Sequence, residues 1–295
     1  MNLINQNRKR KSKIDFELYK RLNEYYANPD NIKKRKEEEN KGKVPKGKQI
    51  SNKEHDKYEY FFAGENEYNI YKKFVEKNFY KKQKSGLQTL EDLAKPELKD
   101  KLFRGSSPKI NCAMNMALRD KGIHVVTQSQ LEYVFQNNLL SLSGVYSDTG
   151  MCLRSDSGAN ENYAKDLINQ LGEQELPVYL PVISYDLIKN KNELGFKVID
   201  KSKIIYLPIL NSPNQSKFDN SDIDLSTGFP IKLNENGART FYTRQDGLSS
   251  CCLDWGSNLG SGDSILSNSL DSGRVVLAKS RSDAFVESTK FLKNF

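Results

Sequence analysis

Hydrophobic positions recur at helical spacing in the first half of the folded part of the chain. Residues 66–82, "NEYNIYKKFVEKNFYKK", place Tyr68, Tyr71, Phe74, Val75 and Phe79 on one stripe. This pattern predicts an amphipathic helix that packs on the main domain and that is also suited to a subunit interface. The next stretch, "TLEDLAKPELKDKLF", predicts short helical pieces that are broken at Pro96.

Two further helices have clear start signals. "SSPKINCAMNMALRDKG" begins with Ser-Ser-Pro and ends at Gly122, with an apolar face made of Ile110, Ala113, Met114, Ala117 and Leu118. Thr127 and Gln130 form a capping box before the apolar residues of a second helix. Between the two helices, "GIHVV" is short enough to predict only a tight connection.

Strand patterns dominate the rest of the chain. "GVYSDTGMCLRSDSG" predicts two short strands around a turn, and a helix over residues 160–172 ends at Gly172. Three stretches are rich in Tyr, Val, Ile and Phe and predict strands: "LPVYLPVISYDLI", "LGFKVIDKSKIIYLPIL" and "GARTFYTRQDGLSS". Helices followed by short strands predict an α+β domain.

Residues 247–277, "GLSSCCLDWGSNLGSGDSILSNSLDSGRVVL", combine a polar composition with leucines that recur at gaps of 5, 6, 7 and 4 residues. The first 27 residues hold 8 Ser and 5 Gly, yet also Leu248, Leu253, Leu259, Leu266 and Leu270. A flexible linker does not need such leucines. Each one, when buried, stabilises the fold by about 1.5–3 kcal/mol, so we expect them to hold the loops between them. The closing "GRVVL" predicts the last strand.

The residues between these leucines predict a binding surface, because small and polar side chains there are free of packing demands. Trp255, the only tryptophan, is expected to be an exposed contact residue. Ser249 and Ser261 are expected to be scaffold hydroxyls that bond local backbone. The predicted ligand-binding face consists of Ser250, Cys252, Asp254, Trp255, Gly256, Asn258, Gly260, Gly262, Asp263, Ser264 and Asp271.

Charge is concentrated at the N-terminus. Residues 1–50 carry 15 Lys or Arg and 7 Asp or Glu. The difference, +8, equals the net charge of the whole chain. This segment is interpreted as a solvated basic arm, with nucleic-acid contact as a less favoured role. The predicted organisation is a basic arm over 1–50, a helical linker over 51–104 and a domain over 105–295.

The sequence favours no enzymatic chemistry, and no catalytic residue, cofactor or metal is predicted. It lacks GxGxxG, GxxxxGK[ST], HExxH and GxSxG, and its four cysteines form no CxxC pair. Cys251 is expected to act as a small hydrophobe, and a bond between the adjacent Cys251 and Cys252 would be strained. Without a signal peptide or a long apolar run, the expected location is the cytoplasm.

Two motifs resemble known families. "KGIHVVTQSQLEYVF" resembles a motif in the sulfatase-modifying-factor branch of the C-type lectin fold, with matching Gly122, Thr127, Glu132 and Tyr133 and with Leu131 where that family has Trp. Residues 246–277 look like the variable region of diversity-generating-retroelement target proteins of archaea and their viruses. The resemblance covers roughly residues 105–280.

This resemblance implies a C-type lectin-like domain whose variable region lies at about 247–277. It implies a ligand-binding protein, not an enzyme, whose surface is rewritten by an error-prone reverse transcriptase and which binds a protein or surface ligand. Display on a virion or a cell surface is compatible with that role. Two alternatives stay open: an oxidoreductase similar to the formylglycine-generating enzyme, and a nucleic-acid-associated protein acting through the basic arm. A calcium-dependent sugar lectin is disfavoured, since Glu-Pro-Asn, Gln-Pro-Asp and Trp-Asn-Asp are missing.

Overall fold

A computed structural model describes residues 53–83, 86–89, 91–190, 193–254, 257–267 and 269–281. All of these residues belong to one of the two units into which the chain divides, residues 50–295. The expected basic arm over 1–50 lies outside the described residues. The described part contains both helices and strands, which confirms the mixed α+β class. Within it, no helix has both the length and the apolar composition needed to cross a membrane.

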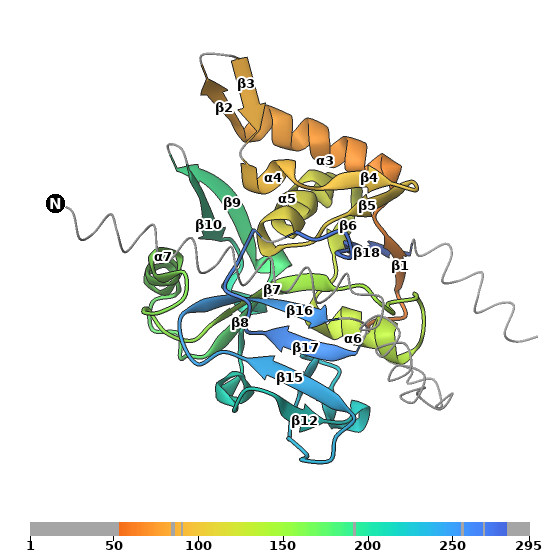
Figure 1. Cartoon of the computed structure of the whole chain (residues 1–295), viewed down its shortest axis with the longest axis vertical. Coiled ribbons are helices and arrows are strands. Elements are labelled where there is room, and N and C mark those ends of the chain that lie inside the picture. The colour runs from red at the N-terminus through yellow and green to blue at the C-terminus, as the bar shows by residue number, and fades with distance from the viewer. Residues whose placement is uncertain are drawn as a thin grey trace, which may run out of the picture. The chain divides into compact units, whose positions relative to one another are not determined.

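A seven-stranded sheet is the largest element of the fold (Figure 1). Its strands lie in the order β11-β8-β7-β16-β17-β15-β12. Their bounds are β11 Ile205–Tyr206, β8 Val178–Pro181, β7 Ser147–Leu153, β16 Leu248–Asp254, β17 Asn258–Ser261, β15 Arg239–Thr243 and β12 Ser216–Phe218. β15 and β17 run parallel, and the other neighbours in this sheet run antiparallel. The polar C-terminal stretch therefore supplies two strands in the interior of the sheet.

A second sheet joins the two ends of the described chain. β18 (Val276–Ser280) lies between β1 (Tyr58–Phe62) and β6 (Ile123–Val125), and it is antiparallel to both. The last strand expected from "GRVVL" is thus confirmed. The tight connection expected at "GIHVV" is wrong, because three of its residues form the edge strand β6 against β18.

The helix predictions from capping signals hold. α5 (Pro108–Leu118) begins after Ser107, whose side chain accepts from the Ile110 N–H. α6 (Gln128–Gln136) has the expected capping box at Thr127, and α7 (Glu161–Leu171) ends at Gly172. The amphipathic helix is α3 (Glu65–Asn78). Its apolar stripe packs into the same core as α5.

In the range 51–104, where a helical linker was expected, the described residues form strands as well as helices and pack into the folded unit. Tyr71 and Val75 of α3 are buried, and Phe103 is completely buried. After the short helix α4 (Glu91–Ala94), the expected helical continuation is wrong: residues 97–104 form the hairpin of β4 (Glu97–Lys99) and β5 (Leu102–Arg104). Its two turn residues, 100 and 101, have positive φ, as a two-residue hairpin turn requires.

Three more hairpins or strand pairs complete the fold: β2 (Tyr80–Gln83) with β3 (Gly86–Thr89), β9 (Tyr185–Asn190) with β10 (Glu193–Val198), and β13 (Ile223–Asp224) with β14 (Phe229–Pro230).

The two strands expected around a turn in residues 144–158 are wrong. That segment forms one strand, β7, and every residue of β7 is buried. A strand that is buried on both faces has no alternating pattern, which explains the error.

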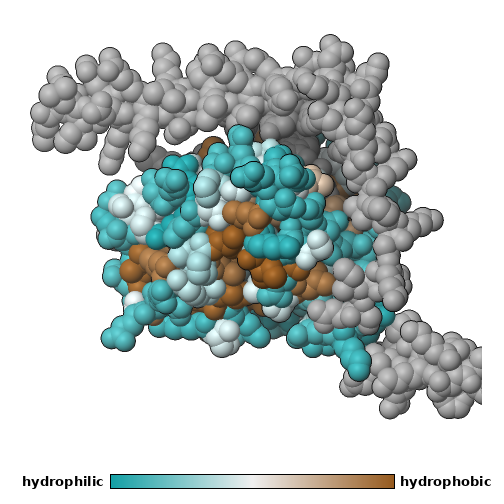
Figure 2. Space-filling model, turned by 90° about the horizontal axis from the view of Figure 1, so that it is seen from below, coloured by the Kyte–Doolittle hydropathy of each residue, from teal (hydrophilic) through white to brown (hydrophobic). Residues whose placement is uncertain are grey.

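The large sheet separates two apolar cores. Met151, Leu153 and Leu248 belong to the core that also contains α3, α5 and α7. Cys152, Cys251 and Leu253 belong to the second core, beside α6. Figure 2 shows an apolar area on the face seen from below Figure 1, bordered by hydrophilic residues. Both sides of β7 are therefore covered, whereas Cys252 and Asp254 in the last part of β16 are partly exposed.

Candidate functional site

The leucines of the C-terminal stretch anchor it as predicted. Leu248, Leu253, Leu259 and Leu266 are each at most 3% exposed. Leu270 is half-buried. Because strands β16 and β17 lie side by side, Leu253 and Leu259 are direct partners in the ladder. The stretch is a folded part of the sheet and not a linker.

Between the leucines, several predicted site residues come together on one surface. Cys252 lies opposite Gly260 in the β16–β17 ladder, and Asp254 lies opposite Asn258. We call this surface the β16–β17 face and define it by its partly or fully exposed residues: Cys252, Asp254, Asn258, Gly260, Gly262, Asp263 and Ser264.

The other four predicted site residues are not among those that define this face. Ser250 is 4% exposed, and its N–H donates to the Asp263 carbonyl, so it adds no exposed surface to the face. A central strand with cores on both sides buries it. Trp255 and Gly256 lie outside the described residues. Asp271 is exposed on the following loop, where its carboxylate lies 3.5 Å from Lys99 Nζ.

Ser249 and Ser261 are scaffold hydroxyls, as expected, although their partners are distant in sequence. The Ser249 hydroxyl donates to the Ser261 carbonyl at 2.6 Å. The guanidinium of Arg154 donates to both hydroxyl oxygens, at 2.9 Å and 2.7 Å. Arg154 also donates to the Leu210 carbonyl, so this buried side chain joins β16, β17 and the segment before β12. The sequence offers one signal for it: a charged residue that directly follows an apolar run.

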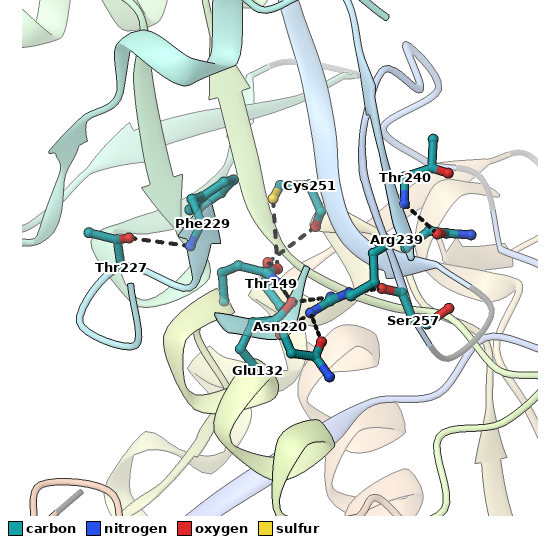
Figure 3. A network of polar contacts seen from close by, with 11 residues as sticks. Glu132, Thr149, Asn220, Thr227, Phe229, Arg239, Thr240, Cys251 and Ser257 are labelled. Carbon is teal, nitrogen blue, oxygen red and sulfur yellow. Dashed lines mark hydrogen bonds and ion pairs between the residues drawn. The ribbon is translucent and has the colours of Figure 1, made fainter. Parts of the chain in front are cut away.

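A buried ion pair fixes the end of the sheet beneath the face (Figure 3). Arg239 of β15 donates two hydrogen bonds to the Glu132 carboxylate of α6, at 2.8 Å and 2.6 Å. Its guanidinium also donates to the Ser257 carbonyl and the Asn220 side chain, and it stacks between Phe135 and Phe218. Since Ser257 directly precedes β17, this contact ties the start of β17 to the ion pair. Arg239 lies more than 100 residues from Glu132, and sequence reasoning missed it.

A buried acid, Asp148 of β7, lies beside the face. It is the ladder partner of Cys252, so Asp148, Cys252 and Gly260 form a row across three strands. Asp148 is 4% exposed, and its Oδ2 has no hydrogen-bond partner. Burial, together with the nearby carboxylates of Asp263 and Asp254, raises the pKa of Asp148 to about 8. Sequence reasoning did not single out this acid.

The cysteines are free and are spread over both sides of the sheet. Cys251 is fully buried in the second core, as expected of a small hydrophobe, and burial raises the pKa of its thiol well above the usual range. Its thiol neighbour is Cys152 of the adjacent strand, which the sequence did not reveal. Burial and three nearby carboxylates also raise the pKa of Cys252. The Cys251 and Cys252 thiols are therefore protonated at neutral pH, the opposite of what a nucleophile needs.

Electrostatically, the face is acidic. The charges of Asp148, Asp254 and Asp263 all contribute to the raised pKa of the Cys252 thiol. The described residues contain no group of three or more His, Cys, Asp or Glu side chains arranged to hold a metal ion. Comparisons with protein-family models, with curated proteins and with solved structures found no match for this chain.

Proposed function

We propose that this protein binds other macromolecules through the β16–β17 face and is not an enzyme. The observation that carries the proposal is the separation of tasks along one segment. Leu248, Leu253, Leu259 and Leu266 are buried and hold the strands, while short polar residues between them are partly exposed. Exposed substitutions usually change stability by less than about 0.5 kcal/mol, so such a face accepts many sequences on one scaffold.

We further propose that the fold is C-type lectin-like. Two features support this proposal. β1 and β18 pair at the two ends of the folded unit, and the two helices α5 and α6 flank the edge strand β6. The matching residues of the resemblance also have structural roles: Thr127 caps α6, and Glu132 pairs with Arg239.

We also propose that a retroelement diversifies this face. The expected genomic signature is a neighbouring reverse-transcriptase gene and a near-copy of the segment encoding residues 247–277 that differs mainly at adenines. Sequencing the source genome tests this point. A genome that lacks both features refutes the retroelement origin and leaves the binding proposal to be tested separately.

Surface display tests the binding proposal directly. The full chain is displayed on yeast with the seven positions of the β16–β17 face randomised, and the library is sorted on an unrelated protein target. We expect most clones to keep protease resistance and some to bind the target. The matched control is the same library carrying Leu253→Asp, which places a charge in the second core and should abolish both properties. A library that loses protease resistance throughout, or that yields no binders, refutes the proposal.

A further inference from the structure

The three acids beside Cys252 indicate what kind of ligand group the face accepts. Asp148 and Cys252 are direct partners in an antiparallel ladder, so their side chains lie on the same side of the sheet. Asp254, two residues along β16 from Cys252, lies on that side as well. Asp263 follows β17, and its carbonyl accepts the Ser250 N–H, which holds it next to β16.

Asp148 gives an independent reason to expect a ligand at this place. Its Oδ2 is buried and accepts no hydrogen bond. A buried carboxyl oxygen without a partner is costly. An arriving N–H donor supplies the missing hydrogen bond, and its positive charge is attracted by the neighbouring carboxylates of Asp254 and Asp263. The partly exposed neighbours Cys252, Gly260 and Gly262 have short side chains or none.

The chemistry favours an organic cation over a metal ion. Ca²⁺ and Mg²⁺ require several oxygen ligands at 2.0–2.6 Å around one point, which is the approximate range for such sites. The described residues offer no such group, and Cys252, whose soft thiol suits neither ion, lies between Asp148 and Gly260 in the ladder. An ammonium or guanidinium group has three to five donors, by the usual count, that spread over separate acceptors.

We propose that Asp148, Asp254 and Asp263 form a subsite of the β16–β17 face that binds a lysine or arginine side chain of a protein partner. This inference rests on the proposed binding function and names the chemistry of its ligand. The basic group lies over the row of Asp148, Cys252 and Gly260, between the acids contributed by β7, β16 and the loop after β17.

Parallel peptide selection tests the subsite. A phage-displayed random peptide library is selected, in the presence of EDTA, on the full-length protein, on Asp254→Asn/Asp263→Asn and on the control Asp166→Asn, whose exposed carboxylate lies on α7. We expect peptides from the wild type and the control to share a Lys or Arg at one position. Replacing it by Gln should weaken binding at least about tenfold, or 1.4 kcal/mol, to the wild type and less than about twofold to the double variant. Peptides with Lys and with Arg at that position are compared to decide between ammonium and guanidinium.

The failures are distinguishable. Two results overturn the subsite and leave the binding function standing. One is that the selected peptides bind the face without a basic residue, and the other is that the Gln replacement weakens binding equally to the wild type and to the double variant. Two other results overturn the proposed function and the subsite together. One is that no peptide is selected, and the other is that substitutions on the face do not change the affinity of the selected peptides. Circular dichroism of each variant verifies that it is folded.

Discussion

Replacing Asp148 by asparagine should change how the stability of the protein depends on pH. Asp148 is buried, and its pKa is raised from 3.8 in the reference state to about 8 in the folded protein. The folded state therefore holds this proton over a pH range in which the unfolded state has released it. A group with a raised folded pKa stabilises the fold fully at pH values below the unfolded pKa, and this stabilisation is lost as pH rises through the folded pKa.

The size of the effect follows from these two values. Each pH unit between them changes the free energy of unfolding by about 1.4 kcal/mol. Between pH 5.5 and 7.5 the free energy of unfolding falls by about 2.5 kcal/mol. This is slightly less than the value for two full pH units, because Asp148 in the folded state begins to ionise as the pH approaches 8. Burial raises the pKa of both Tyr146 and Cys252, so these neighbours stay protonated throughout this range. The asparagine side chain of the variant has nearly the same shape as the aspartate and does not titrate.

Urea denaturation at pH 5.5, 6.5 and 7.5 measures the difference between the wild type and Asp148→Asn. We expect the wild type to lose about 2.5 kcal/mol relative to the variant across this range, so that the variant gains most at high pH. The histidines contribute equally to the pH dependence of both proteins, so their contribution drops out of the difference. Asp166→Asn on the exposed face of α7 serves as the control, and its free energy of unfolding should depend on pH as that of the wild type does. A difference that stays constant within about 0.5 kcal/mol refutes the raised pKa.

Three substitutions test the scaffold, each by urea denaturation. Glu132→Ala should lower the free energy of unfolding by about 3–5 kcal/mol, because it leaves the Arg239 guanidinium buried without its anion. Replacing both partners by Leu and Met should recover most of this loss. An equal loss in the single and the double variant would contradict this explanation. Gly150→Ala should destabilise by more than about 2 kcal/mol, because its Cβ would lie 2.1 Å from a carbonyl oxygen of β8. Leu253→Ala should lower the free energy of unfolding by about 2–5 kcal/mol, and Asp254→Ala should lower it by less than about 0.5 kcal/mol. Similar losses in the two variants would contradict the division into a scaffold residue and a surface residue.

Local signals in the sequence predicted the helices well because their causes are local. The capping residues Ser107 and Thr127 satisfy backbone groups within the next three residues, and both were identified. The leucines of the C-terminal stretch were also predicted to be buried, since large apolar residues inside a polar segment need a core. Four of the five are at most 3% exposed.

Features that depend on distant partners could not be predicted. β7 has a polar appearance because of Ser147 and Asp148, and only the strands on either side of it explain why both are buried. The same holds for Arg239, whose role depends on Glu132 in a helix that precedes it by more than 100 residues. Ser250 belongs to this group as well, because exposure in a strand is decided by what packs on each face.

The pairing of β1 with β18 has a mechanical consequence. Tyr58 at the start of β1 lies opposite Ser280 at the end of β18, so a pull on the two ends of the folded unit acts on the same end of the pair. The hydrogen bonds of this ladder then break one after another instead of sharing the load, and β1 detaches at low force. A carrier that holds the unit by one end leaves the pair unloaded. Tension between both ends acts first on the contacts just outside the ladder, among them the hydrogen bond from the Arg281 N–H to the Lys57 carbonyl, and then on the pair itself.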